Sequence, residues 1–504
     1  MVPLPPITSL PPLILILGVL LSTFHCKTVG EQWRIIKKIH SKLVLGGFFF
    51  HTGLMRFSPF FAFLIVPLAA LYAFPPNNVA LPTPVARPVA QQSVSAQRLP
   101  APTSSGPKQP RQVGAAEGQP LHSTTPFELG ITHLRLNGFD ILQGKRVGLL
   151  THAAAVDERG ISSIDVLKSA PGVNLVALYA PEHGIDGQAP AEKKIEDEQY
   201  DGLPVYSLYG DTRKPTPKML QGIDCMVVDL QDIGSRSYTY ISALKLTMQA
   251  CFEKNIPLIV LDRPNPLGGL KVDGPVLDPH FKSYVGSYEI PYVHGLTIGE
   301  LAMVAQDELR PLKGNLTVVK MMGWKRSMLW GDTGLAWRPT SPAVPTVGAA
   351  FGYPCTGLGA QLGGFRHGYG TEYPFRLLSH PKLTAAALKA RLGRARLPGF
   401  SFDIVKPKKE TEEGVYVRIT NWNSASPIAL SLTMLQIALE IEGKKPFVEI
   451  NNSTANLFCK DWGRAEPLNT LRSGRPLNAW RLAERWQSEA FRWQSLVGRK
   501  YWLY

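Results

Sequence analysis

The sequence has 504 residues, enough for two or three domains, and a formal net charge of +15 at pH 7. Residues 1–125 hold ten basic and two acidic residues, so +8 of that charge lies in the first quarter of the chain. A nucleic-acid-binding domain carries its positive charge on a folded surface, so this distribution argues against nucleic acid as a partner. The five cysteines are widely spaced and form no CxxC pair, which argues against zinc-ribbon and disulfide-framework folds.

Two apolar segments precede the body of the chain. Residues 57–74 form the longer one, directly after Met55 and Arg56. A basic residue followed by an apolar run is typical of a secretory signal, so we predict a leader within residues 1–74. We expect translation to begin at Met55, with residues 1–54 upstream of the true start. A membrane hairpin made with residues 13–21 is the alternative, and an uncleaved segment 57–74 would act as a membrane tether.

The next segment, residues 75–125, contains ten prolines among Ala, Ser and Gln. This composition buries too little apolar surface to fold, so it predicts a disordered linker. A linker after an export signal places the body in the periplasm or another extracytoplasmic space.

From residue 126 onward, short aliphatic runs alternate with helical patterns. The expected strands lie within 145–153, 173–183, 224–232 and 257–265, and the expected helices within 162–170 and 240–255. Strands that alternate with helices predict an α/β fold in which a mostly parallel sheet is covered on both faces. We assign this sheet domain to residues 126–285.

Residues 286–504 have a different pattern and predict a second, smaller α+β domain. Thr297 and Glu300 have the spacing of a capping box, which makes Glu300 a structural residue. Residues 416–420 and 446–450 are expected strands. Residues 479–504 are expected to form an aromatic-rich amphipathic helix followed by a packed tail.

Polar side chains follow all four expected strands of the sheet domain. They are Thr151 and His152; Glu182 and His183; Asp229, Gln231 and Asp232; and Asp262, Arg263 and Asn265. In open α/β sheets, ligands bind beyond the carboxyl ends of the strands, so these clusters predict one binding site. The sequence has no GxGxxG after the first strand and no GxxxxGK[ST], and we therefore expect no nucleotide cofactor.

The clusters suit the cleavage of a glycosidic bond. This reaction needs a protonated carboxylic acid and a second group on the other face of the sugar. Glu182 suits the first role, and Asp229, Asp232 and Asp262 are candidates for the second. A metal site is the rival interpretation, although His152, His183 and the aspartates lack a spacing typical of metal ligands, so we expect no metal.

Six ordered motifs resemble the exo-β-N-acetylmuramidases, a bacterial family long known as a domain of unknown function. They are APEHGIDG (180–187), LPVYSLYGDTRKPTPKML (203–220), VVDLQDIGSRSYTYIS (227–242), VLDRPNPLGGLKVDGPVLDP (260–279), HGLTIGELA (294–302) and RKYWLY (499–504). The resemblance covers residues 127–504. It implies a Rossmann-like domain joined to a smaller C-terminal domain, and removal of N-acetylmuramic acid from the non-reducing ends of peptidoglycan fragments.

The resemblance also implies roles for individual residues. It makes Glu182 the catalytic acid/base, and we take Asp232 and His183 as its candidate catalytic partners. The expected substrate-binding residues are His152, Asp229, Gln231, Arg236, Tyr238, Tyr240, Asp262, Arg263, Asn265, His294 and Glu372. Arg236 or Arg263 would pair with the lactyl carboxylate of muramic acid, or else with a neighbouring aspartate. Tyr238 or Tyr240 would stack on a sugar ring or belong to the core.

The sequence departs from the family pattern in the second domain. Ala343 follows Ser-Pro where the family has Asn, and residues 360–371 lack a glutamate, an asparagine and an arginine, so that Arg366, His367 or Glu372 would have to replace them. Two alternatives to the glycosidase therefore stay open. One is a tethered muropeptide-binding protein without activity, and the other is a metal-dependent cell-wall hydrolase.

Overall fold

The computed structural model describes residues 127–408 and 412–504. The predicted leader and linker, including the tether at 57–74, lie outside these residues. Among the described helices, none has both the length and the apolar character that crossing a membrane requires.

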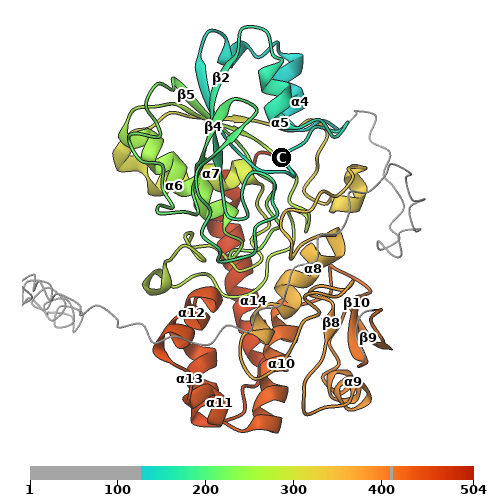
Figure 1. Ribbon diagram of the computed structural model, residues 1–504. Helices are drawn as coiled ribbons and strands as arrows, with labels where there is room; N and C mark the ends of the chain where they lie inside the picture. Colours follow the sequence, from blue (N-terminus) through green and yellow to red (C-terminus); the bar gives the residue numbers. More distant parts are fainter. Residues whose placement is uncertain (1–126, 409–411) are drawn as a thin grey trace, which may run out of the picture. The chain divides into compact units, whose positions relative to one another are not determined.

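A seven-stranded sheet with the strand order β3-β4-β2-β1-β5-β6-β7 forms the first part of the structure (Figure 1). All neighbouring strands pair in parallel except β3, which is antiparallel to β4. The strands are β1 (Arg146–Thr151), β2 (Asn174–Ala180), β3 (Glu198–Tyr200), β4 (Leu203–Ser207), β5 (Cys225–Asp229), β6 (Leu258–Leu261) and β7 (Leu316–Val319). The predicted strands β1, β2, β5 and β6 are confirmed.

Helices cover both faces of this sheet. Val147 and Leu149 of β1 pack in one core cluster with α4 (Gly130–Leu136) and α5 (Ser163–Lys168). Leu150 points to the opposite face, where α6 (Tyr240–Glu253) and α7 (Ile298–Glu308) pack. Because successive side chains of a strand point to opposite faces, a continuous apolar run fills both cores.

Local capping residues fix the starts of two helices as predicted. The Ser162 side chain accepts a hydrogen bond from the Asp165 backbone N–H at the start of α5. Thr297 and Glu300 form a complete capping box at the start of α7. Glu300 is therefore structural, as expected, and its carboxylate also pairs with Arg326.

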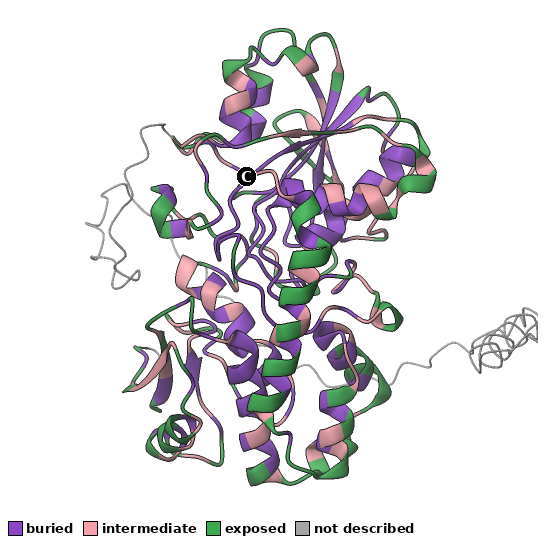
Figure 2. Cartoon of the chain, turned by 180° about the vertical axis from the view of Figure 1, so that it is seen from behind, coloured by how far each residue is buried: buried purple, intermediate pink, exposed green. Residues whose placement is uncertain are grey.

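The second part contains a three-stranded antiparallel sheet, β8-β10-β9, and most of the remaining helices. Its elements are α8 (Val347–Thr356), β8 (Leu377–Leu378), α9 (Ala385–Arg394), β9 (Phe400–Val405), β10 (Gly414–Ile419), α10 (Pro427–Glu442), α11 (Lys445–Val448), α12 (Asn452–Trp462), α13 (Glu466–Ser473) and α14 (Ala479–Leu496). Figure 2 shows that α10 is largely buried, whereas α14 exposes much of its surface. The predicted α+β class of this part is confirmed.

Two expectations about element positions differ from the structure. The expected strand at 446–450 is wrong, because these residues form the short helix α11 and the turn that follows it. Pro446 lies in the first turn of α11, where proline is tolerated, and Phe447 is buried. The main sheet also takes β7 from residues 316–319, beyond the predicted domain boundary at 285.

Candidate active site

The carboxyl ends of β1, β2 and β5 lie side by side and carry most of the predicted site. β1 pairs with both β2 and β5, so His152, Glu182 and Gln231 follow three adjacent strands. Adjacent strands are separated by about 4.8 Å, which places the backbones at the ends of β2 and β5 about 10 Å apart. A sugar ring fits such a span.

Glu182 lies directly beyond β2 and is 7% exposed. Its Oε1 accepts a hydrogen bond from the Glu192 backbone N–H at 3.1 Å, and its Oε2 accepts one from the Thr239 hydroxyl at 2.6 Å. His183 follows with a φ of 77°, and its Nδ1 lies 2.7 Å from the Ala189 carbonyl oxygen. The carboxylate and the neighbouring imidazole thus hold the loop at 182–192 in place.

Two tyrosines lie next to Glu182, and an arginine lies over one of them. Sequence reasoning did not single out these three residues. Burial and the charge of Glu182 raise the pKa of Tyr209 to about 12, and the Arg213 guanidinium opposes this rise. Burial, followed by the charge of Glu182, also raises the pKa of Tyr284. Arg213 lies over the Tyr209 ring, with Cζ 3.6 Å from its centroid. Tyr209 and Arg213 lie within the motif at 203–220, so this motif was the sequence signal that could have identified them.

His152 presents a hydrogen-bond donor toward the site. Its Nε2 accepts the Gln231 backbone N–H at 3.0 Å, so in the neutral ring the proton is on Nδ1. Burial, followed by the positive charges of Arg263 and His183, holds the pKa of His152 well below its usual value of 6.5, which keeps the ring neutral.

Asp232 and His294 face each other in the buried part of the site. His294 Nε2 lies 3.2 Å from Asp232 Oδ2, without the alignment of a hydrogen bond. The Leu296 backbone N–H donates to His294 Nδ1, which leaves the ring proton on the Nε2 that faces Asp232. Gly234 N–H donates to the same Oδ2 at 2.7 Å, so Oδ1 is the available oxygen of Asp232.

Several buried polar atoms near these residues have no hydrogen-bond partner within the part of the chain that the structure describes. They are His152 Nδ1, Gln231 Oε1, Asp232 Oδ1, Thr340 Oγ1 and the hydroxyls of Tyr238, Tyr284 and Tyr288. An unpaired buried polar atom costs folding free energy and is rare in native proteins. A concentration of such atoms around the ends of the strands indicates a region built to receive a polar ligand.

Asp229 and Arg263 form an internal ion pair. The Arg263 guanidinium donates to both Asp229 oxygens, and the Ser163 hydroxyl donates to the same carboxylate. Arg263 Nη2 also donates to the Val156 carbonyl oxygen at 3.0 Å. Arg263 therefore pairs with a neighbouring aspartate, which was the alternative to the predicted contact with the substrate.

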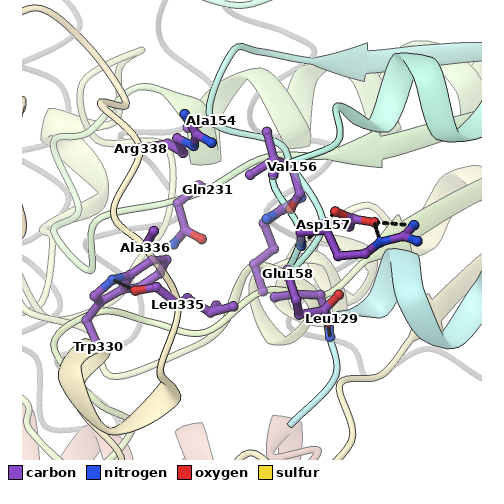
Figure 3. A pocket seen from close by; sticks show the side chains of 13 residues that line it. Leu129, Ala154, Val156, Asp157, Glu158, Gln231, Trp330, Leu335, Ala336 and Arg338 are labelled. Atoms are coloured by element: carbon purple, nitrogen blue, oxygen red, sulfur yellow. Dashed lines mark hydrogen bonds and ion pairs between the residues drawn. The ribbon is translucent and has the colours of Figure 1, made fainter. Parts of the chain in front are cut away.

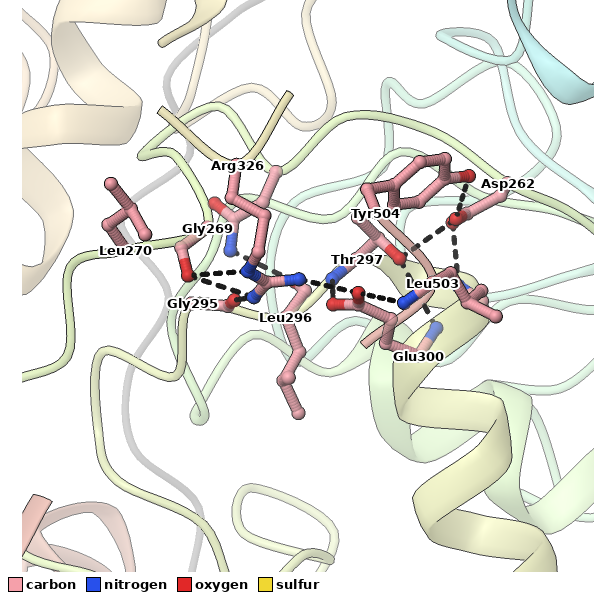
Figure 4. Close-up of polar contacts among 12 residues, drawn as sticks. Asp262, Gly269, Leu270, Gly295, Leu296, Thr297, Glu300, Arg326, Leu503 and Tyr504 are labelled. Carbon is pink, nitrogen blue, oxygen red and sulfur yellow. Dashed lines mark hydrogen bonds and ion pairs between the residues drawn. The ribbon is translucent and has the colours of Figure 1, made fainter. Parts of the chain in front are cut away.

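Asp262 is enclosed by hydrogen-bond donors and does not face the site (Figure 4). Its Oδ1 accepts the backbone N–H groups of Arg263 and Gly299, and its Oδ2 accepts the hydroxyls of Thr297 and Tyr504, at 2.7–2.9 Å. Burial raises the pKa of Asp262 to about 7, against the opposing hydrogen bond from Tyr504. Its carboxylate holds the start of α7 and the chain terminus together.

Among the described residues, the side chains of Arg236 and Asn265 form hydrogen bonds only with backbone groups. Arg236 is fully buried, and its two Nη atoms donate to the carbonyl oxygens of Pro275, Ile290, Asp461 and Trp462. Asn265 accepts the Leu267 N–H and donates to the Leu296 carbonyl oxygen. The guanidinium of Arg236 thus joins the two parts of the structure, and the expected contact with a lactyl carboxylate is not available to it.

The tyrosines divide between the site and the core. Tyr240 is fully buried and donates its hydroxyl to the Thr340 carbonyl oxygen at 2.6 Å, so it is a core residue. Tyr238 packs edge-on against Tyr240 and Tyr353, with ring centroids 4.8 and 6.1 Å apart. Tyr353 belongs to α8, and its pKa is raised by burial first and then by the charges of Asp461, Glu182 and Asp232. Sequence reasoning missed this residue of the second part.

The residues expected to replace the family's missing groups lie on the second part. Glu372 is exposed and accepts the Lys408 backbone N–H at 2.9 Å. Arg366 is also exposed, whereas His367 stacks on Phe375 with centroids 4.5 Å apart. Phe375 contacts Tyr353 in turn, so His367 is connected to the site only through two aromatic rings.

A pocket of about 100 Å³ opens beside Gln231 and is lined by residues that follow β1, β5 and β6 (Figure 3). Arg263 is one of the lining residues, and Trp330 and Arg338 come from the segment that precedes α8. Gln231 directs its carboxamide toward this space. Glu182 is not among the lining residues. The pocket therefore lies beside the site around Glu182 and does not include that carboxylate.

Among residues 127–408 and 412–504, no three His, Cys, Asp or Glu side chains come close enough to hold a metal ion together. The four described cysteines, Cys225, Cys251, Cys355 and Cys459, are buried and free.

The fold and the site together define a two-part α/β protein with a carboxylate-centred polar site at the C-terminal edge of its parallel sheet. Residues 147–348 match the N-terminal domain of the exo-β-N-acetylmuramidase NamZ, and residues 351–504 match its C-terminal domain. The chain therefore belongs to the NamZ exo-β-N-acetylmuramidase family.

Individual relatives agree with this assignment. The peptidoglycan β-N-acetylmuramidase NamZ of Bacillus subtilis (strain 168) is 45% identical over 263 residues, which is 52% of this chain and 63% of that protein. Two crystal structures of DUF1343 family proteins from Bacteroides fragilis NCTC 9343 are similar, at 40% and 25% identity with TM-scores of 0.68 and 0.56. Each comparison covers 75% of this chain and 99% of the other.

Proposed function

We propose that this protein is an exo-acting glycoside hydrolase that removes terminal N-acetylmuramic acid, or a closely related amino sugar, from the non-reducing ends of peptidoglycan fragments. The observation that carries the proposal is the position of Glu182, a buried carboxylate at the sheet edge among polar atoms that lack partners. The name of the Bacillus subtilis relative supports the substrate class.

We propose separate roles for the residues of the site. Glu182 donates a proton to the glycosidic oxygen as the bond between that oxygen and the anomeric carbon breaks, and water completes the hydrolysis. Thr239 and Glu192 orient its carboxylate. Asp232, whose Oδ1 is available, serves as the second carboxylate, and His294 holds it in place. His183 acts by fixing the loop that carries Glu182.

The variant Glu182→Gln tests this proposal directly. Because Gln cannot donate a proton in the same way, we expect the release of N-acetylmuramic acid from a chromogenic glycoside to fall about 10²–10⁴-fold. The thermal unfolding midpoint should stay close to that of the wild type. Glu198→Gln, an exposed position on β3, is the matched control. Undiminished turnover by Glu182→Gln contradicts the proposal.

A muropeptide-binding protein without activity is the second candidate, because Ala343 and the segment 360–371 depart from the family pattern. Incubation of the protein with muropeptides, followed by mass spectrometry, separates the two functions. Release of a single terminal sugar identifies the hydrolase, whereas binding without release identifies the binding protein. Loss of release on chelation, restored by added metal, would identify the third possibility, a metal-dependent hydrolase.

We also propose that the protein is exported and that residues 57–74 act as a signal or a tether. The support is the apolar run after Met55 and Arg56, followed by a proline-rich linker. N-terminal sequencing of the mature protein tests this, because a species that retains Lys37 or Lys38 excludes a start at Met55. Recovery of the protein in the cytoplasmic fraction would contradict export.

A further inference from the structure

This inference rests on the proposed function. Muramic acid differs from other amino sugars by its lactyl carboxylate, and a planar guanidinium recognises a carboxylate through two parallel hydrogen bonds. The two arginines expected to supply this contact are both occupied: Arg236 binds four backbone carbonyl oxygens, and Arg263 binds Asp229. The site therefore needs another cation if it is to select this sugar.

Arg213 lies over Tyr209, a neighbour of Glu182, and has no acidic partner among the described residues. It lies in the segment between β4 and β5, with its guanidinium 3.6 Å from the centroid of Tyr209 and 5.5 Å from that of Tyr284. Its Nη1 donates to the Gly210 carbonyl oxygen at 3.1 Å, and its side chain also hydrogen-bonds with Tyr209. It forms no ion pair within this part of the chain, so its positive charge has no acidic partner among the described residues.

The nearby acidic residues do not neutralise Arg213. Asp211, two residues earlier in the chain, pairs with Lys194 at 2.9 Å. Glu253 pairs with the following residue, Lys214, at 2.7 Å. Each of these carboxylates has its own lysine, so the charge of Arg213 remains available for a ligand.

The position of Arg213 relative to the reacting group is also suitable. Burial and the negative charge of Glu182 raise the pKa of both Tyr209 and Tyr284, and the positive charge of Arg213 lowers it. The two charges therefore lie near the same pair of rings. Stacking on Tyr209 limits the orientations of the guanidinium, which lowers the entropy lost when it binds a ligand. A sugar with its glycosidic oxygen at Glu182 would then have a substituent within reach of Arg213.

We infer that Arg213, stacked on Tyr209 and free of acidic partners, binds the lactyl carboxylate of the terminal sugar and makes the site selective for muramic acid over glucosamine.

The experiment compares two substrates that differ only in the lactyl group, the chromogenic β-glycosides of N-acetylmuramic acid and N-acetylglucosamine. For Arg213→Gln in the full chain, we expect KM for the muramic substrate to rise about 10- to 100-fold, as for loss of a charge-assisted hydrogen bond. The kinetic constants for the glucosamine substrate should change less than twofold. Arg213→Lys keeps the positive charge but loses the planar guanidinium that forms two parallel hydrogen bonds, so it should give an intermediate KM.

Arg499→Gln is the matched control, because Arg499 also lies over an aromatic ring, that of Trp502 at 5.4 Å, but its side chain is exposed. It should leave both substrates unaffected. Two results would overturn the inference. One is an equal loss on both substrates in Arg213→Gln, which would mean that the residue only positions Glu182. The other is a loss of selectivity for the muramic substrate in Arg338→Gln but not in Arg213→Gln.

If the wild type releases neither sugar, the proposed function fails, but the inference about Arg213 can still be tested by binding. Calorimetry with N-acetylmuramic acid and N-acetylglucosamine should show a preference for the former that Arg213→Gln abolishes. Equal binding of the two sugars by the wild type would overturn the inference.

Discussion

Arg236 illustrates how the fold can use a charged side chain that, from sequence, looks like a binding residue. Its guanidinium is completely buried and satisfies four carbonyl oxygens from three separate segments of the chain. Burial lowers its pKa to about 10, which leaves it charged at neutral pH. A cation with these partners contributes to the stability of the junction between the two parts.

Replacement of Arg236 by Lys therefore tests a structural role. A lysine has three donors on one atom and cannot reach four carbonyl oxygens, so buried acceptors are left unpaired. We expect the free energy of unfolding to fall by about 2–4 kcal/mol, measured by urea denaturation. Selectivity between the two sugar substrates should persist. Arg418→Lys, in an exposed pair with Asp403, is the control and should change stability little.

The role of an individual residue could be predicted only where the residues next to it in the sequence indicated its position in the fold. Glu182 stands at the end of an apolar run, so its place at the edge of the sheet followed from local pattern. The partners of Arg236 lie up to 226 residues away, and no local pattern encodes them. Arg213 and Tyr353 were missed because their relation to Glu182 depends on how loops and the second part fold back over the strands.

At the scale of elements, continuous apolar runs identified β1, β2, β5 and β6 because buried parallel strands need apolar residues on both faces. The shorter strands β3, β4 and β7 are partly or fully exposed and lack such runs. Residues 446–450 contain β-branched and aromatic residues, yet they form α11, because Pro446 suits a first helical turn and tertiary packing buries Phe447.

The buried carboxylate of Asp461, on α12, makes the free energy of unfolding depend on pH. Burial raises the pKa of Asp461 from 3.8 to about 7, although Gln361 donates to it. Between these values the folded state binds more protons than the unfolded state, so the free energy of unfolding falls as pH rises from about 4 to about 7. We expect Asp461→Asn to reduce this slope, so that the thermal midpoint of the variant changes less between pH 5 and pH 8 than that of the wild type. An unchanged slope would contradict the assignment.

At the scale of the whole molecule, the C-terminal segment returns to the sheet part. The Tyr504 hydroxyl donates to Asp262 and accepts the Met321 backbone N–H at 2.8 Å, and the Leu503 N–H donates to Glu300. Arg326, which pairs with Glu300, also lies 4.0 Å from the centroid of Trp502. These contacts join the last residues of the chain to the start of α7.

Removing one hydroxyl from this junction should be measurable. Tyr504→Phe leaves the Met321 N–H without its acceptor and Asp262 without a donor, so we expect a loss of about 1–3 kcal/mol in the free energy of unfolding. The Tyr504 hydrogen bond favours the ionised form of Asp262, whose pKa is about 7. The loss should therefore be larger at pH 8 than at pH 5. Equal losses at the two pH values would contradict this role of the hydroxyl.

The junction at Tyr504 also bears on how the protein is made and handled. Asp262 cannot acquire the Tyr504 donor until residue 504 has left the ribosome, so this hydrogen bond forms only after both parts of the structure have been synthesised. A truncation that removes Tyr504 would leave Asp262 without this donor and the Met321 N–H without its acceptor. A purification strategy that keeps residues 502–504 in place should therefore yield more folded protein than one that removes them.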